Sequence, residues 1–181
     1  MKKVLLDACV LYPTVMREVL LNVAAKGLFT PLWSDRILEE WARAARKIGP
    51  TGEAQARTEV ALVKAAWPKA SIKPHAGLEA RLYLPDENDI HVLAAAIAGH
   101  ADELVTMNAS DFPQNTLREE GIERRDPDGF LWELASHHPD LVLAACEDVR
   151  LTAERLSGQP WHMRKLMKKA RLPRLGKMLG A

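Results

Sequence analysis

Three acidic residues lie at points where elements of the chain are expected to begin or end, and a fourth lies on a predicted helix. Asp7 follows a short apolar run, Asp89 begins a long apolar run, and Asp111 lies in a polar loop after residues 103–107. Glu40 lies at the margin of the apolar stripe of a predicted helix, so its carboxylate can reach a shared crevice. Because the carboxyl ends of parallel strands face the crevice where ligands bind, these side chains could converge there.

Crowded carboxylates repel one another, which raises their pKa values and favours a bound cation. Carboxylate oxygens are hard ligands that suit Mg²⁺ or Mn²⁺ and leave room for water and for substrate phosphate. A divalent ion held in this way can polarise a phosphorus centre, activate a water for in-line attack and stabilise the leaving oxygen. The acids therefore indicate metal-assisted hydrolysis of a phosphate ester.

Each acid also has a purely structural interpretation. An Asp at a helix start is commonly a cap, so Asp89 could serve only that purpose. Asp111 could cap the turn that follows it, and Glu40 could be an ordinary solvated helix residue. Asp7 differs, because an acid that ends a buried apolar strand is costly without a partner. A functional role is thus favoured for Asp7. The order and spacing of the four acids strengthen the case for a functional role of the other three.

The sequence excludes several common kinds of catalytic site. Its ten glycines form neither the GxGxxG pattern of dinucleotide-binding folds nor a P-loop, and no serine lies in a GxSxG turn. Cys9 and Cys146 make neither a disulfide framework nor a zinc spacing. The longest apolar run, residues 92–98, is far shorter than the roughly 20 residues of a membrane helix. These observations predict a soluble cytoplasmic protein with no membrane contact.

Strands and helices alternate along much of the chain. Short apolar runs predict strands that end near Asp7 and that cover residues 71–73, 103–107 and 122–124, with residues 28–33 as a connector. Capping residues, prolines and hydrophobic periodicity predict helices at 13–26, 35–47, 53–67, 89–99, 129–137, 140–156 and 160–170. Strands separated by helices, without a hairpin pattern, predict an α/β fold with a parallel sheet and helices on both faces.

Four segments resemble the motifs of PIN domains, in the order in which that family has them. Residues 4–13 are similar to the opening of the domain, and residues 34–41 to its second motif, in which an acid follows a capped helix start. Residues 86–96 resemble the third motif, and residues 105–112 resemble the fourth, with the pattern T-x-N-x-x-D-F. The resemblance implies a PIN-like parallel sheet flanked by helices.

The end of the chain lies outside these motifs. We expect a PIN-like nuclease domain over residues 1–127 and a helical extension with a basic tail over residues 128–181. Residues 151–181 hold eight basic side chains against the single acid Glu154, although the whole chain has a net charge of +1. Three interpretations of the basic tail stay open, namely a solvated helix face, contact with RNA phosphates, and docking on an acidic partner.

The resemblance implies a metal-dependent endoribonuclease, most often the toxin of a VapBC-type toxin–antitoxin pair. Its catalytic set would consist of four metal-holding acids and two supporting residues: Asp7, Glu40, Asp89 and Asp111, with Thr106 and Asn108. The metal would be Mg²⁺ or Mn²⁺, and the adjacent Asp86 could join or replace one of the acids. The implied partners are RNA, a cognate antitoxin and a second copy of the chain. Cys9 stands where PIN domains commonly have Asn or Ser, which weakens any supporting role of that position.

Two other functional classes remain open. A catalytically silent PIN-type module that binds RNA or protein would not need the full acidic set, so the presence of all four acids disfavours it. A receiver-like signalling domain also places acids and a threonine at strand ends, but it expects two adjacent acids near the start and a late lysine. Here Asp7 stands alone, and no lysine lies between Lys73 and Lys165. His91 is interpreted as a packed residue rather than a metal ligand.

Overall fold

A computed structural model describes residues 1–180 of the chain, so Ala181, the last residue of the predicted extension, lies outside the described residues. The described residues form one sheet of five parallel strands in the order β3-β2-β1-β4-β5. These strands are β1 (Lys3–Leu6), β2 (Thr30–Ser34), β3 (Ser71–Ile72), β4 (Glu103–Val105) and β5 (Glu123–Arg125). The predicted parallel α/β sheet is confirmed.

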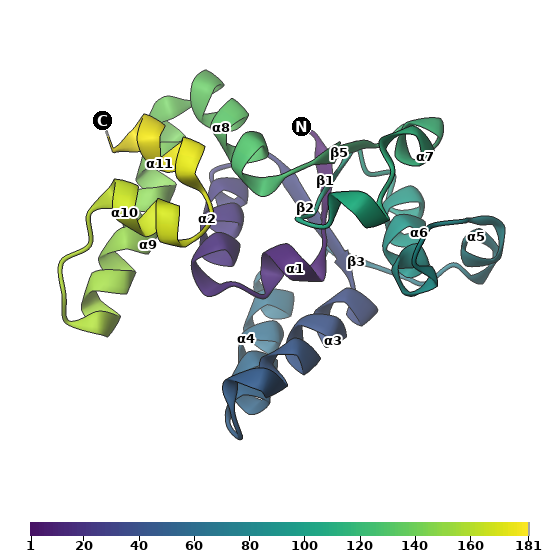
Figure 1. The fold of residues 1–181 in the computed structure, drawn as a ribbon, viewed down its shortest axis with the longest axis horizontal. Helices are drawn as coiled ribbons and strands as arrows, with labels where there is room; N and C mark the ends of the chain where they lie inside the picture. The colour runs from purple at the N-terminus through teal and green to yellow at the C-terminus, as the bar shows by residue number, and fades with distance from the viewer. Residues whose placement is uncertain (181) are drawn as a thin grey trace.

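Helices connect every pair of consecutive strands. They are α1 (Ala8–Leu11), α2 (Thr14–Ala25), α3 (Asp35–Ala44), α4 (Gly52–Ala66), α5 (Ala76–Arg81), α6 (Ile90–Ala98) and α7 (Gln114–Glu119). Short 3₁₀ turns lie at η1 (Ala45–Ile48), η2 (Glu87–Asp89) and η3 (Ala109–Asp111). Figure 1 shows α2 and α6 on opposite sides of the strands. This follows from the right-handed crossover rule, because the chain moves outward from β1 to β3 and then returns past β1 to β4.

The central strand β1 and the helix α6 form the middle of the core. Val4, Leu5 and Leu6 of β1 are fully buried, as expected for a parallel strand covered on both faces. Residues of α6 such as Val92 and Leu93 are also fully buried, which confirms the prediction that this apolar helix lies inside the fold. Within residues 1–180, no helix combines the length and the apolar character that crossing a membrane requires.

The prediction that residues 28–33 form a connector is wrong, because Thr30–Ser34 is the strand β2. Pro31 lies inside this strand and lacks the N–H group that a ladder normally uses. The strand tolerates it because the pairing with β3 starts only at Trp33, whose N–H donates to the Ala70 carbonyl at 3.0 Å. The missing N–H of Pro31 therefore faces the side of β2 on which β3 has not yet begun.

Sequence patterns also missed four short helices, namely α1, α5, α7 and α11 (Pro173–Leu179). Each has at most seven residues, too few to show a hydrophobic period. Local capping starts two of them: the Asp7 carboxylate accepts the N–H of Ala8, and His75 Nδ1 accepts the N–H of Leu78 at 3.1 Å. Short-range hydrogen bonds, rather than periodicity, start α1 and α5.

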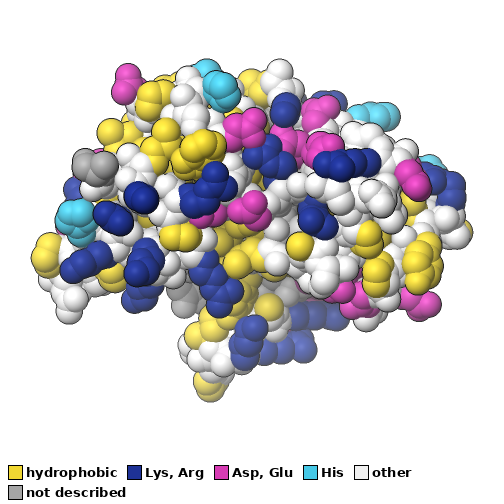
Figure 2. Space-filling model, turned by 45° about the horizontal axis from the view of Figure 1, so that its top comes forward, with side chains coloured by type: hydrophobic (Ala, Val, Ile, Leu, Met, Phe, Trp, Pro, Cys, Tyr) yellow, Lys and Arg dark blue, Asp and Glu magenta, His cyan; other side chains and the backbone are white. Residues whose placement is uncertain are grey.

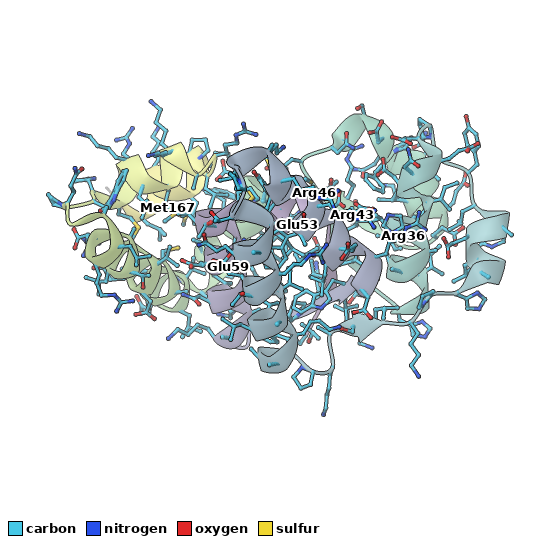
Figure 3. All side chains as sticks on the ribbon, turned by 90° about the horizontal axis from the view of Figure 1, so that it is seen from below. Arg36, Arg43, Arg46, Glu53, Glu59 and Met167 are labelled. Atoms are coloured by element: carbon cyan, nitrogen blue, oxygen red, sulfur yellow. The ribbon has the colours of Figure 1, made fainter. Side chains whose placement is uncertain are left out.

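Ion pairs join α3 to the elements that follow it, and Figure 3 shows them from below, with Arg43, Arg46 and Glu53 labelled. Arg57 of α4 pairs with Glu39 of α3 at 2.8 Å and with Glu53 at 2.7 Å. Arg46 of η1 also pairs with Glu53, at 2.6 Å. The network links α3, η1 and α4, the segment that carries Glu40 and Lys47.

The C-terminal helices α8 (Pro127–His137), α9 (Pro139–Ser157), α10 (Met163–Lys169) and α11 pack together beside α2, at the left of Figure 1. The buried carboxylate of Asp128 in α8 accepts the backbone N–H groups of Arg174 and Leu175, each at 3.0 Å. It therefore caps α11 from a distant part of the chain. Leu172 and Leu175 are fully buried, so the basic tail is docked on the body of the protein.

Candidate active site

The ends of β1 and β4 meet at the point where the strand order reverses. Asp7 directly follows β1, and Thr106 directly follows β4. The Asp7 N–H donates to the Val105 carbonyl at 3.1 Å, so the pairing of the two strands continues up to the site. Chain segments leave these neighbouring strands toward opposite faces of the sheet, which opens a crevice at their carboxyl ends.

Asp7 is a buried carboxylate whose two oxygens both have partners. It is 6% exposed, its Oδ1 accepts the Ala8 N–H at 2.8 Å, and its Oδ2 accepts the Thr106 hydroxyl at 2.8 Å. These bonds offset part of the cost of burying the carboxylate. Thr106 therefore supports Asp7 directly, across 99 positions of sequence.

Cys9 contacts the same carboxylate, so the expectation that its position contributes little support is wrong. Its Sγ lies 3.4 Å from Asp7 Oδ2 and 3.4 Å from Thr106 Oγ1, and it accepts the Met107 N–H at 3.3 Å. Burial, with the nearby charge of Asp7, raises the pKa of Cys9 to about 12. The side chain thus stays a neutral thiol whose S–H can donate to Asp7, as the hydroxyl of a serine would.

Asp86, Asp89 and Asp111 form a compact acidic cluster at the other side of the crevice. One carboxylate oxygen from each lies within 4.8 Å of the others. Asp89 occupies the N-cap position of α6, yet its side chain makes no capping hydrogen bond. Its Oδ2 is buried and has no hydrogen-bond partner among the described residues. The interpretation of Asp89 as an ordinary helix cap is therefore wrong.

Asn108 positions the third member of this cluster. Its Nδ2 donates to Asp111 Oδ2 at 2.6 Å, and its backbone N–H donates to Thr106 Oγ1 at 3.0 Å. The loop after β4 consequently joins the carboxylate of Asp111 to the hydroxyl that supports Asp7. This short network holds both parts of the site together.

Glu40 faces the crevice from α3 and pairs with His91 of α6. Oε1 of Glu40 is hydrogen-bonded to His91 Nε2, and the imidazole is 6% exposed. His91 is packed, as expected, but sequence patterns missed its contact with Glu40. The available signal was its position, two residues after Asp89 at the start of the buried helix.

The acids interact electrostatically across the crevice. The pKa of Asp89 is raised to about 6, first by burial and then by four neighbouring negative charges, those of Asp7, Asp86, Asp111 and Glu40. Burial also raises the pKa of Asp7, although hydrogen bonds from Thr106, Cys9 and the Ala8 backbone act in the opposite direction. Ionised Asp89 is therefore unfavourable in the fold unless a cation offsets the surrounding charge.

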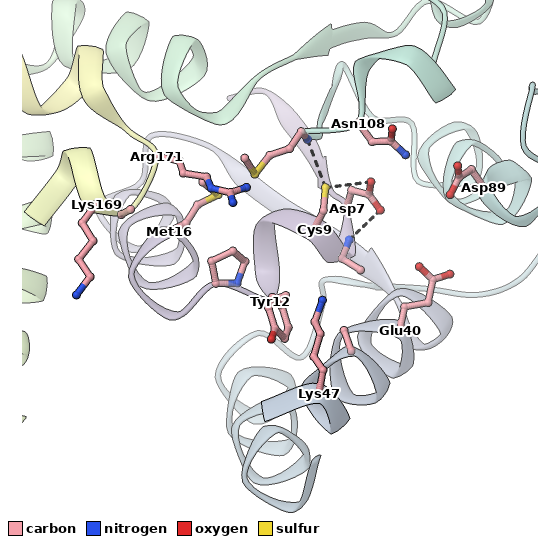
Figure 4. Close-up of a pocket in the computed structure, with 15 residues that line it drawn as sticks. Asp7, Cys9, Tyr12, Met16, Glu40, Lys47, Asp89, Asn108, Lys169 and Arg171 are labelled. Atoms are coloured by element: carbon pink, nitrogen blue, oxygen red, sulfur yellow. Dashed lines mark hydrogen bonds between the residues drawn. The ribbon is translucent and has the colours of Figure 1, made fainter. Parts of the chain in front are cut away.

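A cleft of about 640 Å³ opens in front of these residues. Asp7, Glu40, Asp89 and Asn108 line one side of it, as the close-up in Figure 4 shows. The cleft is open to solvent and continues past α1 toward the C-terminal helices. Its volume leaves room for a ligand much larger than a water molecule.

The family model described as PIN domain matches residues 3–110. The chain belongs to the PIN domain family. No curated protein and no solved structure matches it. PIN domains are commonly nucleases and typically use divalent metal ions, and the matched residues contain Asp7, Glu40, Asp86 and Asp89.

This PIN domain arranges its acids in two groups that share Asp89. Asp89 belongs to the compact cluster with Asp86 and Asp111, and it also lines the cleft with Asp7 and Glu40. Within residues 1–180, the compact cluster includes Asp86, whereas Asp7 and Glu40 lie outside it. The set expected from the motifs thus converges on one crevice, with Asp86 as an additional member.

Proposed function

We propose that this PIN domain is a metal-dependent endoribonuclease that hydrolyses RNA phosphodiester bonds. The observation that carries the proposal is the compact cluster of Asp86, Asp89 and Asp111, which opens through Asp89 onto a cleft lined by Asp7 and Glu40. The proposal places the nuclease in residues 1–127 and treats residues 128–181 as a helical extension. Membership of the PIN domain family supports the reaction class.

The residues present fit a hard divalent cation. Three carboxylate oxygens lie within 4.8 Å of one another, and the buried Oδ2 of Asp89 has no hydrogen-bond partner within residues 1–180. Asp86, Asp89 and Asp111 would hold Mg²⁺ or Mn²⁺, and Asp7 and Glu40 add negative charge next to them. When bound, the metal supplies Lewis-acid polarisation of the phosphodiester and activation of a water.

The protein's own groups position the reactants. Thr106, Cys9 and the Ala8 N–H fix the Asp7 carboxylate, and Asn108 fixes Asp111. Glu40 lines the cleft opposite this network and is oriented by His91. We assign the Glu40 carboxylate as the general base that accepts the proton of the attacking water, because His91 pairs with its Oε1 and its Oε2 has no hydrogen-bond partner among residues 1–180.

Cleavage of RNA should depend on both the divalent metal and the acids. Purified protein incubated with mixed cellular RNA and Mn²⁺ should shorten the RNA, whereas excess EDTA or the Asp7→Asn variant should leave it intact. Asparagine keeps the shape of the side chain but removes the charge that favours a cation. Gel analysis of RNA length measures the result. Equal cleavage in Mn²⁺ and in EDTA, or by both proteins, would contradict the proposal.

We further propose that the protein is the cytoplasmic toxin of a VapBC-type pair, that it forms homodimers, and that a small antitoxin neutralises it. An acidic cleft is most simply blocked by a partner that inserts an Arg or Lys side chain. Such a side chain would offset the charge that raises the pKa of Asp89 and would compete with metal for the same oxygens. We expect the antitoxin to be encoded beside this protein.

Expression of this protein without its partner should slow the growth of a bacterial host, because uncontrolled RNA hydrolysis removes the RNA that protein synthesis requires. The matched control is Asp7→Asn, which should permit normal growth at the same protein level. Growth curves with immunoblots of both proteins measure the difference. Identical growth of the two strains would contradict the toxin assignment. The nuclease proposal is tested separately, by the RNA cleavage experiment.

A further inference from the structure

The cleft beside the acids is positively charged on its other walls. Lys47 of η1 lines one wall, and Lys169 and Arg171, at the end of α10 and in the turn after it, line another. In Figure 4, Arg171 extends toward the cleft, whereas Lys169 points away from it. Within residues 1–180, none of the three makes an ion pair with a carboxylate. Their charges are therefore available to an anionic ligand.

Arg171 occupies a position that normally suits glycine. Helix α10 ends in a Schellman turn, in which the Leu172 N–H donates to the Met167 carbonyl at 2.8 Å and the Arg171 N–H donates to the Lys168 carbonyl at 3.1 Å. Arg171 has φ = 64°, a left-handed conformation that is unfavourable for a residue with a Cβ. The turn itself thus gives no reason for an arginine. The position of Arg171 on the wall of the cleft does, because it brings a positive charge there.

The backbone that carries Arg171 is firmly held. Leu172, the next residue, is fully buried, and the Asp128 carboxylate accepts the N–H groups of Arg174 and Leu175. On the opposite wall, Lys47 belongs to the ion-paired segment of α3, η1 and α4, and its Nζ lies 5.0 Å from the centroid of the Tyr12 ring. Both cations are presented from anchored elements.

Charge complementarity indicates what the cleft holds. The acidic wall repels RNA, so affinity must come from bound metal and from cations elsewhere in the cleft. A guanidinium offers a planar set of donors that matches phosphate oxygens, and an ammonium serves as a point charge for them. On the face shown in Figure 2, Lys and Arg side chains gather at the left, over the C-terminal helices, and at the bottom, over the projecting segment of α3, η1 and α4.

We propose that Arg171 and Lys47 bind backbone phosphates of single-stranded RNA next to the bond that is cleaved. The C-terminal extension then forms one wall of the substrate site, although it lies outside the residues that match the PIN family model. This inference rests on the proposed nuclease function, because it assigns the strand that the acids would cut. It also favours RNA contact among the three interpretations of the tail.

The variants Arg171→Gly and Lys47→Ala test the proposal separately. Glycine accepts φ = 64° without strain, so the first variant removes the side chain and keeps the turn. Binding of a fluorescently labelled single-stranded RNA is measured in EDTA, so that no cleavage occurs, over a series of salt concentrations. Each variant should bind RNA several-fold more weakly at low salt, with the slope of log K against log salt reduced by roughly 0.7.

Lys177→Ala is the matched control, because Lys177 is exposed on α11, carries the same charge and does not line the cleft. Its salt slope should equal that of the wild type. A slope equal to the wild type for Arg171→Gly or for Lys47→Ala would overturn the proposal. Urea unfolding of every variant confirms that the compared proteins are folded.

The outcome is separable from that of the proposed function, because binding in EDTA does not require catalysis. If the wild type cuts RNA but the variants keep its salt slope, the phosphate assignment alone fails. If the wild type does not cut RNA in Mn²⁺, the nuclease proposal fails, and with it the assignment of these phosphates to a substrate.

Discussion

Replacing Asp89 with asparagine should lower the rate of RNA cleavage roughly a thousandfold or more, while the protein stays folded. Asp89 is the acid that belongs both to the cluster with Asp86 and Asp111 and to the wall of the cleft. Its loss removes one of the three proposed metal ligands, and a thousandfold effect corresponds to about 4 kcal/mol of transition-state stabilisation. Initial rates at saturating Mn²⁺, measured with a labelled RNA, test this expectation.

The control for this experiment is Glu87→Gln, which removes one negative charge from an exposed neighbour in η2. Glu87 is not a member of the acidic cluster, so its variant should cleave RNA at the wild-type rate within about twofold. If Asp89→Asn cleaves RNA as fast as Glu87→Gln does, Asp89 has no role in catalysis and the metal-site proposal fails.

The same substitution should stabilise the metal-free protein near neutral pH. The pKa of Asp89 is about 6 in the fold instead of 3.8, so its contribution to stability is complete below pH 4 and is lost as the pH rises through 6. Asparagine cannot ionise and avoids this loss, which we expect to be about 1.5 kcal/mol after solvent screening of a partly exposed group. Urea unfolding at pH 7 and pH 4 should show the gain at the higher pH only. Added Mn²⁺ should stabilise the wild type more than the variant.

Replacing Asp128 with alanine should lower the free energy of unfolding by about 3 kcal/mol. The substitution leaves the N–H groups of Arg174 and Leu175 without their acceptor and removes a buried carboxylate that joins α8 to α11. Urea unfolding measures the change, and hydrogen exchange should show faster opening of α11 than of the sheet. The result would establish that the C-terminal helices are part of the cooperative structure.

Asp140→Ala provides the comparison, because Asp140 is an exposed acid in the first turn of α9. Its loss should change stability by no more than about 0.5 kcal/mol. Equal unfolding midpoints for Asp128→Ala and Asp140→Ala would show that the cap on α11 does not hold the tail. In that case the burial of Leu172 and Leu175, rather than the Asp128 cap, would hold Arg171 beside the cleft.

The elements that carry the motifs could be predicted because their signals are local. Ser34 is an N-cap whose Oγ accepts the Ile37 N–H at 3.2 Å, so the start of α3 and the place of Glu40 on it follow from nearby residues. The apolar runs of β1 and α6 likewise indicate burial, which put Asp7 and Asp89 at the ends of buried elements. A residue's own neighbours suffice for such inferences.

Patterns failed where an element depended on distant partners. Residues Thr30–Ser34 form a strand despite Pro31, because β1 pairs with one side of it and β3 covers only the end of the other. Tertiary contacts outweighed local preference in this strand.

The sequence by itself determined which residues could do chemistry and that several of them stand at the ends of buried elements. Only the tertiary structure decided which of them meet: Asp86 joins Asp89 and Asp111, and His91 pairs with Glu40 across 51 positions. It also decided that the turn containing Arg171 lines the same cleft as Asp7. The physical reason is that helix and strand signals act over a few residues, whereas these contacts are produced by the crossing of chain segments at the carboxyl edge of the sheet.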